Sequence, residues 1–217
     1  MLIGWYHLTL RTVTVATVPI LGDVENVTES HILAFYEPVG DQLLGVHDVC
    51  TIEVSGSTDI VQTTLPPAFV DSLPLNRYSV ALSTVDGVQR IDATFHEVFI
   101  GYDPALGPIP TTITDPQVAD TDGDGMPAAT LVVTVPLFDP VPVRTAQHTQ
   151  VRVDGAWNGT QWEGTSELLT IEAIVLEADS PLFQRQPVVR ATSGDFTLVP
   201  LEGRVDCDQL VESLKEP

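Results

Sequence analysis

The chain has 217 residues, of which 43% are hydrophobic and 18% are charged, and this balance excludes an intrinsically disordered protein. Acidic residues outnumber basic ones by 30 to 9, which gives a net charge of −21. Nucleic acids and anionic membrane surfaces are therefore poor partners, because both are polyanions. No apolar stretch is long enough to cross a bilayer, so we expect no transmembrane segment.

The basic residues are almost all arginine, and Lys215 is the only lysine. One interpretation is adaptation to high salt, in which acidic side chains hold the hydration layer. The other is an exported acidic protein encoded by a genome rich in guanine and cytosine. We favour the second, because surfaces adapted to salt are usually more densely charged than this one.

Extended patterns dominate the first part of the chain. Threonine and valine alternate over residues 2–18, which predicts a strand, and Pro19 and Gly22 end it. Residues 29–37 and 42–54 carry two further strand patterns on either side of a short turn. These two segments therefore predict a β-hairpin.

A second hairpin is predicted further along. Residues 60–64 favour a short strand, and a proline-started helix is expected near 67–73. Strands over 77–83 and 87–100 then flank an Asp-Gly dipeptide at 86–87, which is a strong turn signal.

Residues 102–128 have no strand pattern and contain five prolines, so we predict a long loop. Long loops in compact domains are uncommon and often functional.

A C-terminal tail at 202–217 is expected to hold a helix capped by Asp206. Between the loop and the tail, further strands are predicted over 130–135, 141–153, 160–178, 188–192 and 195–201.

Eight to ten strands at short spacing, with little helix, indicate an all-β protein. We predict a single domain over 1–217, built as one antiparallel β-barrel. An immunoglobulin-like or jelly-roll β-sandwich is the alternative.

The sharpest chemical signal is Asp-Thr-Asp-Gly-Asp-Gly at 120–125. Carboxylates at alternate positions, separated by glycine, can fold around one hard cation such as Ca²⁺. Asp120, Asp122 and Asp124 are therefore candidate calcium ligands. The alternative is a solvated acidic turn, because Asp and Gly favour turns without any ion.

This run resembles the first half of an EF-hand loop and the calcium loops of thrombospondin-type repeats and dockerins. Ala128 and Leu131 stand where an EF-hand has its later ligands, so the resemblance ends there. It implies the three aspartates and the Met126 carbonyl as ligands. Asp115 or Asp103 is expected to supply a further oxygen, and the expected role of calcium is structural.

The two cysteines, Cys50 and Cys207, lie 157 positions apart and form no C-x-x-C pair. We predict a disulfide worth about 4 kcal/mol in the chain-entropy model, with two buried thiols as the alternative. A disulfide implies an oxidising compartment, so a secreted, periplasmic or cell-surface location in a bacterium is expected. Residues 1–7 lack the features of a signal peptide. If the protein is exported, its signal peptide is therefore expected to have been removed.

No catalytic signature is present. The chain has no G-x-S-x-G elbow and no P-loop, and its histidines show no metal-ligand spacing. Glu163, Glu167 and Glu172 lie near or within one predicted strand, where a glycosidase would need two facing carboxylates, and exposed acids are their ordinary interpretation. The histidines are His7, His31, His47, His96 and His148.

Trp157 and Trp162 flank a turn at Asn158-Gly159. They predict either a stacking platform for a flat ligand or, as the favoured interpretation, a cover for the open end of the hairpin. At the N-terminus, Gly4-Trp5 opens the first strand and is loosely similar to the G-x-W start of calycin and lipocalin barrels. This resemblance implies an eight-stranded barrel with an interior ligand site.

The expected function is an extracytoplasmic binding module for a small apolar or amphipathic ligand, with a structural calcium loop. A structural or adhesive surface protein without a ligand is the second possibility. A hydrolase that uses clustered carboxylates is the third.

Overall fold

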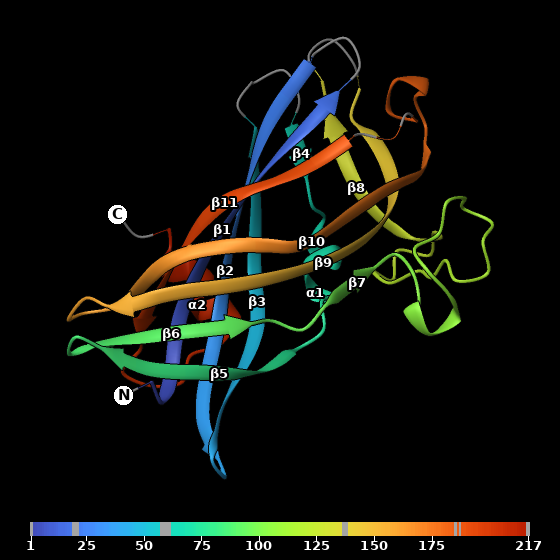
Figure 1. The fold of residues 1–217 in the computed structure, drawn as a ribbon. Coiled ribbons are helices and arrows are strands. Elements are labelled where there is room, and N and C mark those ends of the chain that lie inside the picture. Colours follow the sequence, from blue (N-terminus) through green and yellow to red (C-terminus); the bar gives the residue numbers. More distant parts are fainter. Residues whose placement is uncertain are drawn as a thin grey trace.

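The structure is a computed structural model that describes residues 2–18, 22–56, 62–135, 139–184, 186 and 188–215. Its eleven strands in these ranges form one antiparallel sheet (Figure 1). The strands are β1 (Gly4–Val18), β2 (Gly22–Val39), β3 (Gln42–Gly56), β4 (Gln62–Thr64), β5 (Asn76–Val85), β6 (Val88–Thr94), β7 (Val98–Ile100), β8 (Ala129–Thr134), β9 (Val141–Trp157), β10 (Trp162–Ala178) and β11 (Val188–Pro200). The helices are α1 (Pro67–Asp71), α2 (Cys207–Ser213) and the 3-10 turns η1 (Pro104–Leu106) and η2 (Pro181–Phe183).

Eight of these strands close into a ring. Their order is β10-β11-β1-β2-β3-β5-β6-β9, and pairing between β9 and β10 closes the circle. A sheet closed on itself is a barrel, so the prediction of an all-β antiparallel barrel is confirmed.

The barrel wall changes partners along β9. The C-terminal part of β9 pairs with β6 over Arg152–Ala156. The N-terminal part of β9 pairs with β8 over Val141–Thr145. β7 fills the interval between them, and β4 extends the sheet beyond β8. The barrel therefore has two ends that are built from different strands.

One end of the barrel is filled by side chains, and we call it the closed end. The period of two along β1 places Leu8 and Leu10 inside while Trp5, His7 and Thr9 lie on the outer face. The cluster that fills the closed end consists of Leu2, Tyr6, Leu8, Leu10, Ile32, Ala34, Tyr36, Tyr78, Val80, Ile91, Ala93, Phe95, Val153, Trp162, Phe196 and Leu198.

The seam between β10 and β11 is paired only at the closed end. Its register ends at Ser166 opposite Gly194. A Cβ on Gly194 would lie 2.0 Å from the Arg11 carbonyl oxygen, so only glycine allows this close approach. Beyond this point β10 pairs with β9 and β11 pairs with β1, and the two strands separate.

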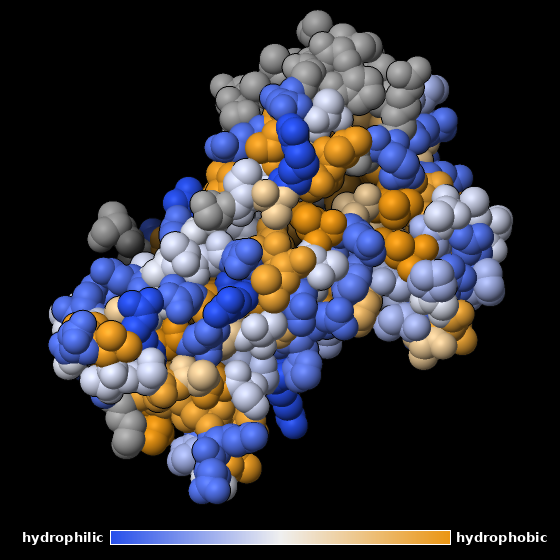
Figure 2. Space-filling view, viewed as in Figure 1, coloured by the Kyte–Doolittle hydropathy of each residue, from blue (hydrophilic) through white to orange (hydrophobic). Residues whose placement is uncertain are grey.

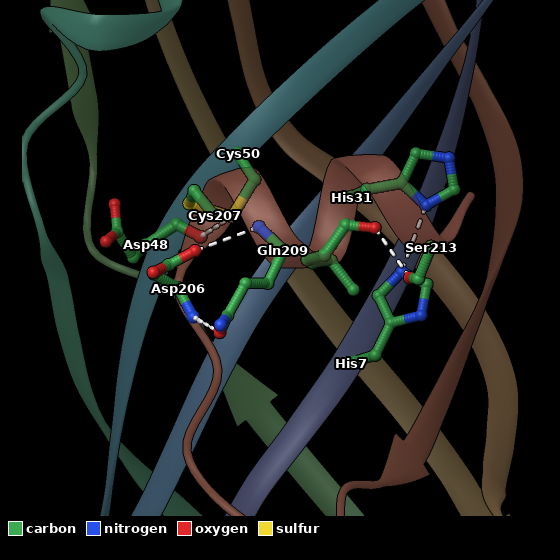
Figure 3. The surroundings of a disulfide bond; sticks show 9 residues. His7, His31, Asp48, Cys50, Asp206, Cys207, Gln209 and Ser213 are labelled. Carbon is green, nitrogen blue, oxygen red and sulfur yellow. Dashed lines mark hydrogen bonds between the residues drawn. A yellow bond between two sulfur atoms is a disulfide. The ribbon is translucent and has the colours of Figure 1, made fainter. Parts of the chain in front are cut away.

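A disulfide joins Cys50 of β3 to Cys207, the first residue of α2, with a Cα–Cα distance of 5.0 Å (Figure 3). This is the pairing expected from the sequence. α2 lies against the outer face of β2 and β3 and buries Leu210. Its start is a capping box, in which Asp206 accepts the backbone N–H of Gln209.

Most predicted elements appear with shifted ends. The strand expected over 87–100 is wrong as one element, because residues 95–97 interrupt it between β6 and β7. Segments 188–192 and 195–201, expected as two strands, form the single strand β11. No helix in the described ranges has the length and apolarity needed to cross a membrane.

Candidate ligand cavity and calcium loop

The open half of the barrel encloses a cavity of about 420 Å³. The packed cluster of the closed end is its floor, where Leu10, Ile32 and Phe95 reach it. Its walls come from the inner faces of β1, β2 and β3 on one side and of β8, β9 and β10 on the other. This volume lies within the range that small-molecule sites occupy.

The cavity has a polar wall and an apolar wall. The polar wall consists of Thr12, Thr14, Asn26, Thr28 and Ser30, all on β1 and β2. The apolar wall consists of Leu131 of β8, Val143 of β9 and Leu168, Ile171, Ala173 and Val175 of β10, and β9 also contributes the polar residues Thr145, Gln147 and Thr149 to the lining. Among the described residues that line the cavity, none is an aspartate, glutamate, lysine or arginine.

The side chains of the polar wall are free to bind a ligand. None of its five members has a side-chain hydrogen bond or ion pair with another group in the described part of the chain. Buried or enclosed polar groups normally find a partner, so a partner is expected to come from the contents of the cavity. Hydroxyl and amide groups both donate and accept hydrogen bonds.

The floor carries one buried polar network. The His47 Nε2 contacts the hydroxyl groups of Tyr36, at 3.2 Å, and Tyr78, and the two tyrosine hydroxyls lie 3.0 Å apart. Burial lowers the pKa of His47 to about 3 and raises the pKa of both tyrosines. All three groups are therefore neutral at physiological pH, and the cavity floor adds no charge.

The cavity reaches the surface where β10 and β11 separate. Val175 and Val189 lie on the two sides of this opening, and Figure 2 shows apolar side chains around a hollow between β11 and β8. The side-chain amide of Gln186 bonds the backbone N–H and carbonyl of Val175. This contact covers part of the free edge of β10 and limits its pairing with another chain.

The acidic loop gathers its three aspartates as predicted. One oxygen from each of Asp120, Asp122 and Asp124 lies within 4.8 Å of the others. Gly123 and Gly125 have φ angles of 68° and 82°, which favour glycine, and they turn the backbone N–H groups toward Asp120.

Asp122 is the buried member of the group and has an exposed fraction of 6%. Its Oδ2 accepts the backbone N–H of Thr130 at 2.8 Å, but its Oδ1 has no hydrogen-bond partner. Burial raises the pKa of Asp122, and the charges of Asp124 and Asp120 raise it further. A cation bound by these oxygens would relieve both effects, and carboxylate oxygens are the donors that Ca²⁺ prefers. The three residues therefore fit a calcium ion.

The loop is bonded to two strands of the cavity wall. The Thr130 hydroxyl donates to Asp124 Oδ2 at 2.6 Å, which ties the start of β8 to the loop. The backbone N–H of Gly101, directly after β7, donates to Thr121 Oγ1 at 2.9 Å. A Cβ on Gly101 would lie 2.2 Å from the Thr145 carbonyl oxygen, so the loop crosses β9 in close contact.

The other two aspartates expected as ligands, Asp115 and Asp103, do not belong to this group. Asp115 caps its own turn by accepting the backbone N–H groups of Thr111 and Thr112, and Asp103 caps η1. The Met126 N–H donates to Asp124 Oδ1, which keeps Met126 next to the group.

The carboxylate and tryptophan candidates do not meet in the cavity, whereas the histidines His47 and His96 both line it. Glu163, Glu167 and Glu172 are exposed and are not among its lining residues. Trp162 is 1% exposed and lies in the core, so it cannot form a stacking platform for a ligand. Trp157 packs against it with ring centroids 5.6 Å apart, so the pair covers the end of the hairpin as favoured.

The sequence predicted an interior ligand site only through the resemblance to calycin barrels, and it assigned none of the residues that line the cavity to that site. Its signal was present in the threonines of β1 and β2, which alternate with valine and whose inward members form the polar wall. Trp5 lies on the outer face against Phe35, with the Arg204 guanidinium 5.5 Å from its ring centroid. The resemblance to calycin barrels, which rests on Gly4-Trp5, stays a prediction.

Comparisons of the chain with protein-family models, curated proteins and solved structures find no match.

Proposed function

We propose that this protein is a binding module for a small, uncharged, amphipathic ligand that occupies the barrel cavity. The observation that carries the proposal is a cavity of about 420 Å³ whose described lining contains no aspartate, glutamate, lysine or arginine. An enclosed space of this kind is a common form of ligand site. An eight-stranded barrel has room for one small ligand.

The two walls define the chemistry of the ligand. Burying an ion without a partner costs far more than burying a hydrogen-bonded hydroxyl or amide, so the lining favours neutral molecules. The polar wall supplies donors and acceptors along one side, and the apolar wall supplies dispersion contacts along the other. A ligand with hydroxyl or carbonyl groups along one edge and a hydrocarbon face along the other matches both walls.

Calcium has a structural role in this proposal. The loop is bonded to Thr130, next to the wall residue Leu131, and to Gly101, next to the wall residue Ile100. An ion held by Asp120, Asp122 and Asp124 would order the segment between these attachment points. Calcium would therefore stabilise the shape of the cavity without touching the ligand.

The disulfide favours an oxidising location such as the periplasm, the cell surface or the medium. The net charge of −21 suits a protein that must stay dispersed among other acidic macromolecules. We infer an extracytoplasmic site of action from these two features together.

Native mass spectrometry of the protein purified from its own host tests the function. The expected result is a co-purifying mass of a neutral small molecule that departs on denaturation. A matched binding assay compares a neutral fluorescent amphiphile with a fatty-acid anion of the same length. Preference for the neutral probe supports the proposal. A ligand-free protein that binds neither probe would contradict it.

A further inference from the structure

Two histidines that are 24 residues apart face one another on the outer wall of the barrel. Thr9 of β1 is paired with His31 of β2, and His7 lies two residues from Thr9 on the same face. Strand periodicity therefore places all three side chains together outside the barrel. Figure 3 shows the two rings beside α2.

The two rings present nitrogen atoms at a metal-binding separation. His7 Nε2 and His31 Nδ1 lie 3.0 Å apart. Metal–nitrogen bonds of about 2.0–2.1 Å place two ligands about 2.9 Å apart at a right angle and about 3.3 Å apart at the tetrahedral angle. One ion therefore fits between the two nitrogens with almost no movement of the strands.

A carboxylate already holds the second nitrogen of His31. Glu29 Oε1 lies 3.3 Å from His31 Nε2, and a carboxylate at this position favours the tautomer whose proton is on Nε2 and whose Nδ1 lone pair is directed to His7. Arg11 fixes Glu29 from the other side, with its Nε 3.4 Å from Oε2, and Asp195 holds Arg11 at 3.1 Å. Histidines that bind metals usually donate their outer N–H to a carboxylate in this way.

The surroundings of the two rings favour metal binding. Burial lowers the pKa of His7, and the neighbouring His31 lowers it further. The Thr9 hydroxyl lies 3.4 Å from His7 Nε2 and 3.5 Å from His31 Nδ1, where it can bond a water on the ion. The His31 side chain is 13% exposed, which leaves a route for an ion from solvent.

We propose that His7 and His31 form a binding site for a divalent transition metal such as Zn²⁺ or Cu²⁺, with Glu29 as the outer carboxylate. Imidazole nitrogens suit these ions, whereas the oxygen atoms of the acidic loop suit calcium. Water molecules complete the coordination. On binding, the proton on His7 Nε2 moves to Nδ1 of the same ring, so that His7 Nε2 and His31 Nδ1 both present a lone pair to the ion. The site is independent of the barrel cavity and of the proposed ligand.

Calorimetric titration with Zn²⁺ tests the proposal, in saturating calcium so that the acidic loop is not available. The expected result is one site per chain that weakens at least tenfold in His7→Gln and in His31→Gln. Glu29→Gln should weaken it by about 10- to 100-fold, because the outer partner orients the ring. His148→Gln is the matched control and should bind as the wild type does, since Glu97 and Glu172 flank its ring on opposite sides.

Ring ¹⁵N resonances of the wild-type protein provide a second readout that requires no variant. Zn²⁺ should shift the signals of His7 and His31 and leave that of His148 in place. The proposal is overturned if the wild type binds no zinc, if both glutamine variants bind as tightly as the wild type, or if only other histidines respond.

Discussion

Asp122 Oδ2 accepts the backbone N–H of Thr130 at 2.8 Å, so the buried aspartate of the acidic loop is bonded to the second residue of β8. The next residue on that strand, Leu131, lines the cavity. This hydrogen bond and two others link the acidic loop to strands of the candidate ligand site. The state of the loop and the shape of the cavity wall are expected to depend on one another.

Calcium should stabilise the fold through this loop. At a free concentration 100 times Kd the gain is about 2.7 kcal/mol, or roughly 5–11 °C in Tm for a chain of this size. Asp122→Asn should remove the response, whereas Asp115→Asn should keep it, because Asp115 lies outside the group of three. Scanning calorimetry in calcium and in chelator measures both. An equal response in the two variants would contradict the proposed ligands.

Without calcium, the same Asp122→Asn change should not destabilise the protein at neutral pH. The pKa of Asp122 is raised by burial and by neighbouring acids, so its contribution favours the fold at low pH and is lost as pH rises through the folded pKa. Asparagine removes the charge and can still accept the Thr130 N–H. Unfolding in chelator at pH 4 and pH 7 measures this, and a marked loss of stability at pH 7 would contradict it.

Filling the cavity should block the ligand and spare the fold. Ala173→Trp places a large side chain in the open space beside the apolar wall, where it meets little overpacking. We expect at least tenfold weaker binding of a neutral fluorescent amphiphile, with Tm unchanged or raised. Glu167→Trp on the exposed face of β10 is the matched control. Equal binding by both variants would place the ligand elsewhere.

Removing the disulfide should lower stability and release α2. The loop that the bond closes is long, so the free energy of unfolding should fall by about 4 kcal/mol in Cys50→Ser/Cys207→Ser. Urea unfolding measures the change, and proteolysis should cut the chain after β11 sooner in the variant. Reductant should affect the wild type alone. An unchanged urea midpoint would show that packing of α2, and not the bond, holds the tail.

His47 should make stability depend on pH. Burial lowers its folded pKa from 6.5 to about 3, so the unfolded chain takes up a proton first. The contribution of His47 to the free energy of unfolding is therefore fully present above pH 6.5. It is lost as the pH falls from 6.5 toward 3, by about 1.4 kcal/mol per pH unit.

His47→Phe should flatten this part of the pH profile and cost about 1–3 kcal/mol at pH 7, because Tyr78 loses a buried partner. The difference between the two proteins, measured by urea unfolding from pH 4 to pH 7, cancels the other titrating groups. A constant difference across that range would rule out His47 as the source.

The sequence by itself determined most of the local elements, the cluster of three aspartates and the disulfide pair. Alternation of threonine and valine predicted β1, the Asp-Gly pair placed the turn between β5 and β6, and Asp206 predicted the start of α2. The acidic run could be recognised because its three aspartates are close neighbours in the chain. Because the chain has only two cysteines, only one disulfide pairing within the chain was possible.

Only the tertiary structure decided whether the barrel interior is filled or hollow, and which side chains meet on its outer face. A period of two shows that Thr12 and Thr14 share a face, but strands distant in sequence decide whether that face is filled or hollow. The separation of β10 from β11 beyond Gly194 creates the opening, and no local pattern encodes it. His7 and His31 meet because the register of β1 and β2 brings them together. Register is a property of the paired strands, so the spacing of these histidines in the sequence carried no signal.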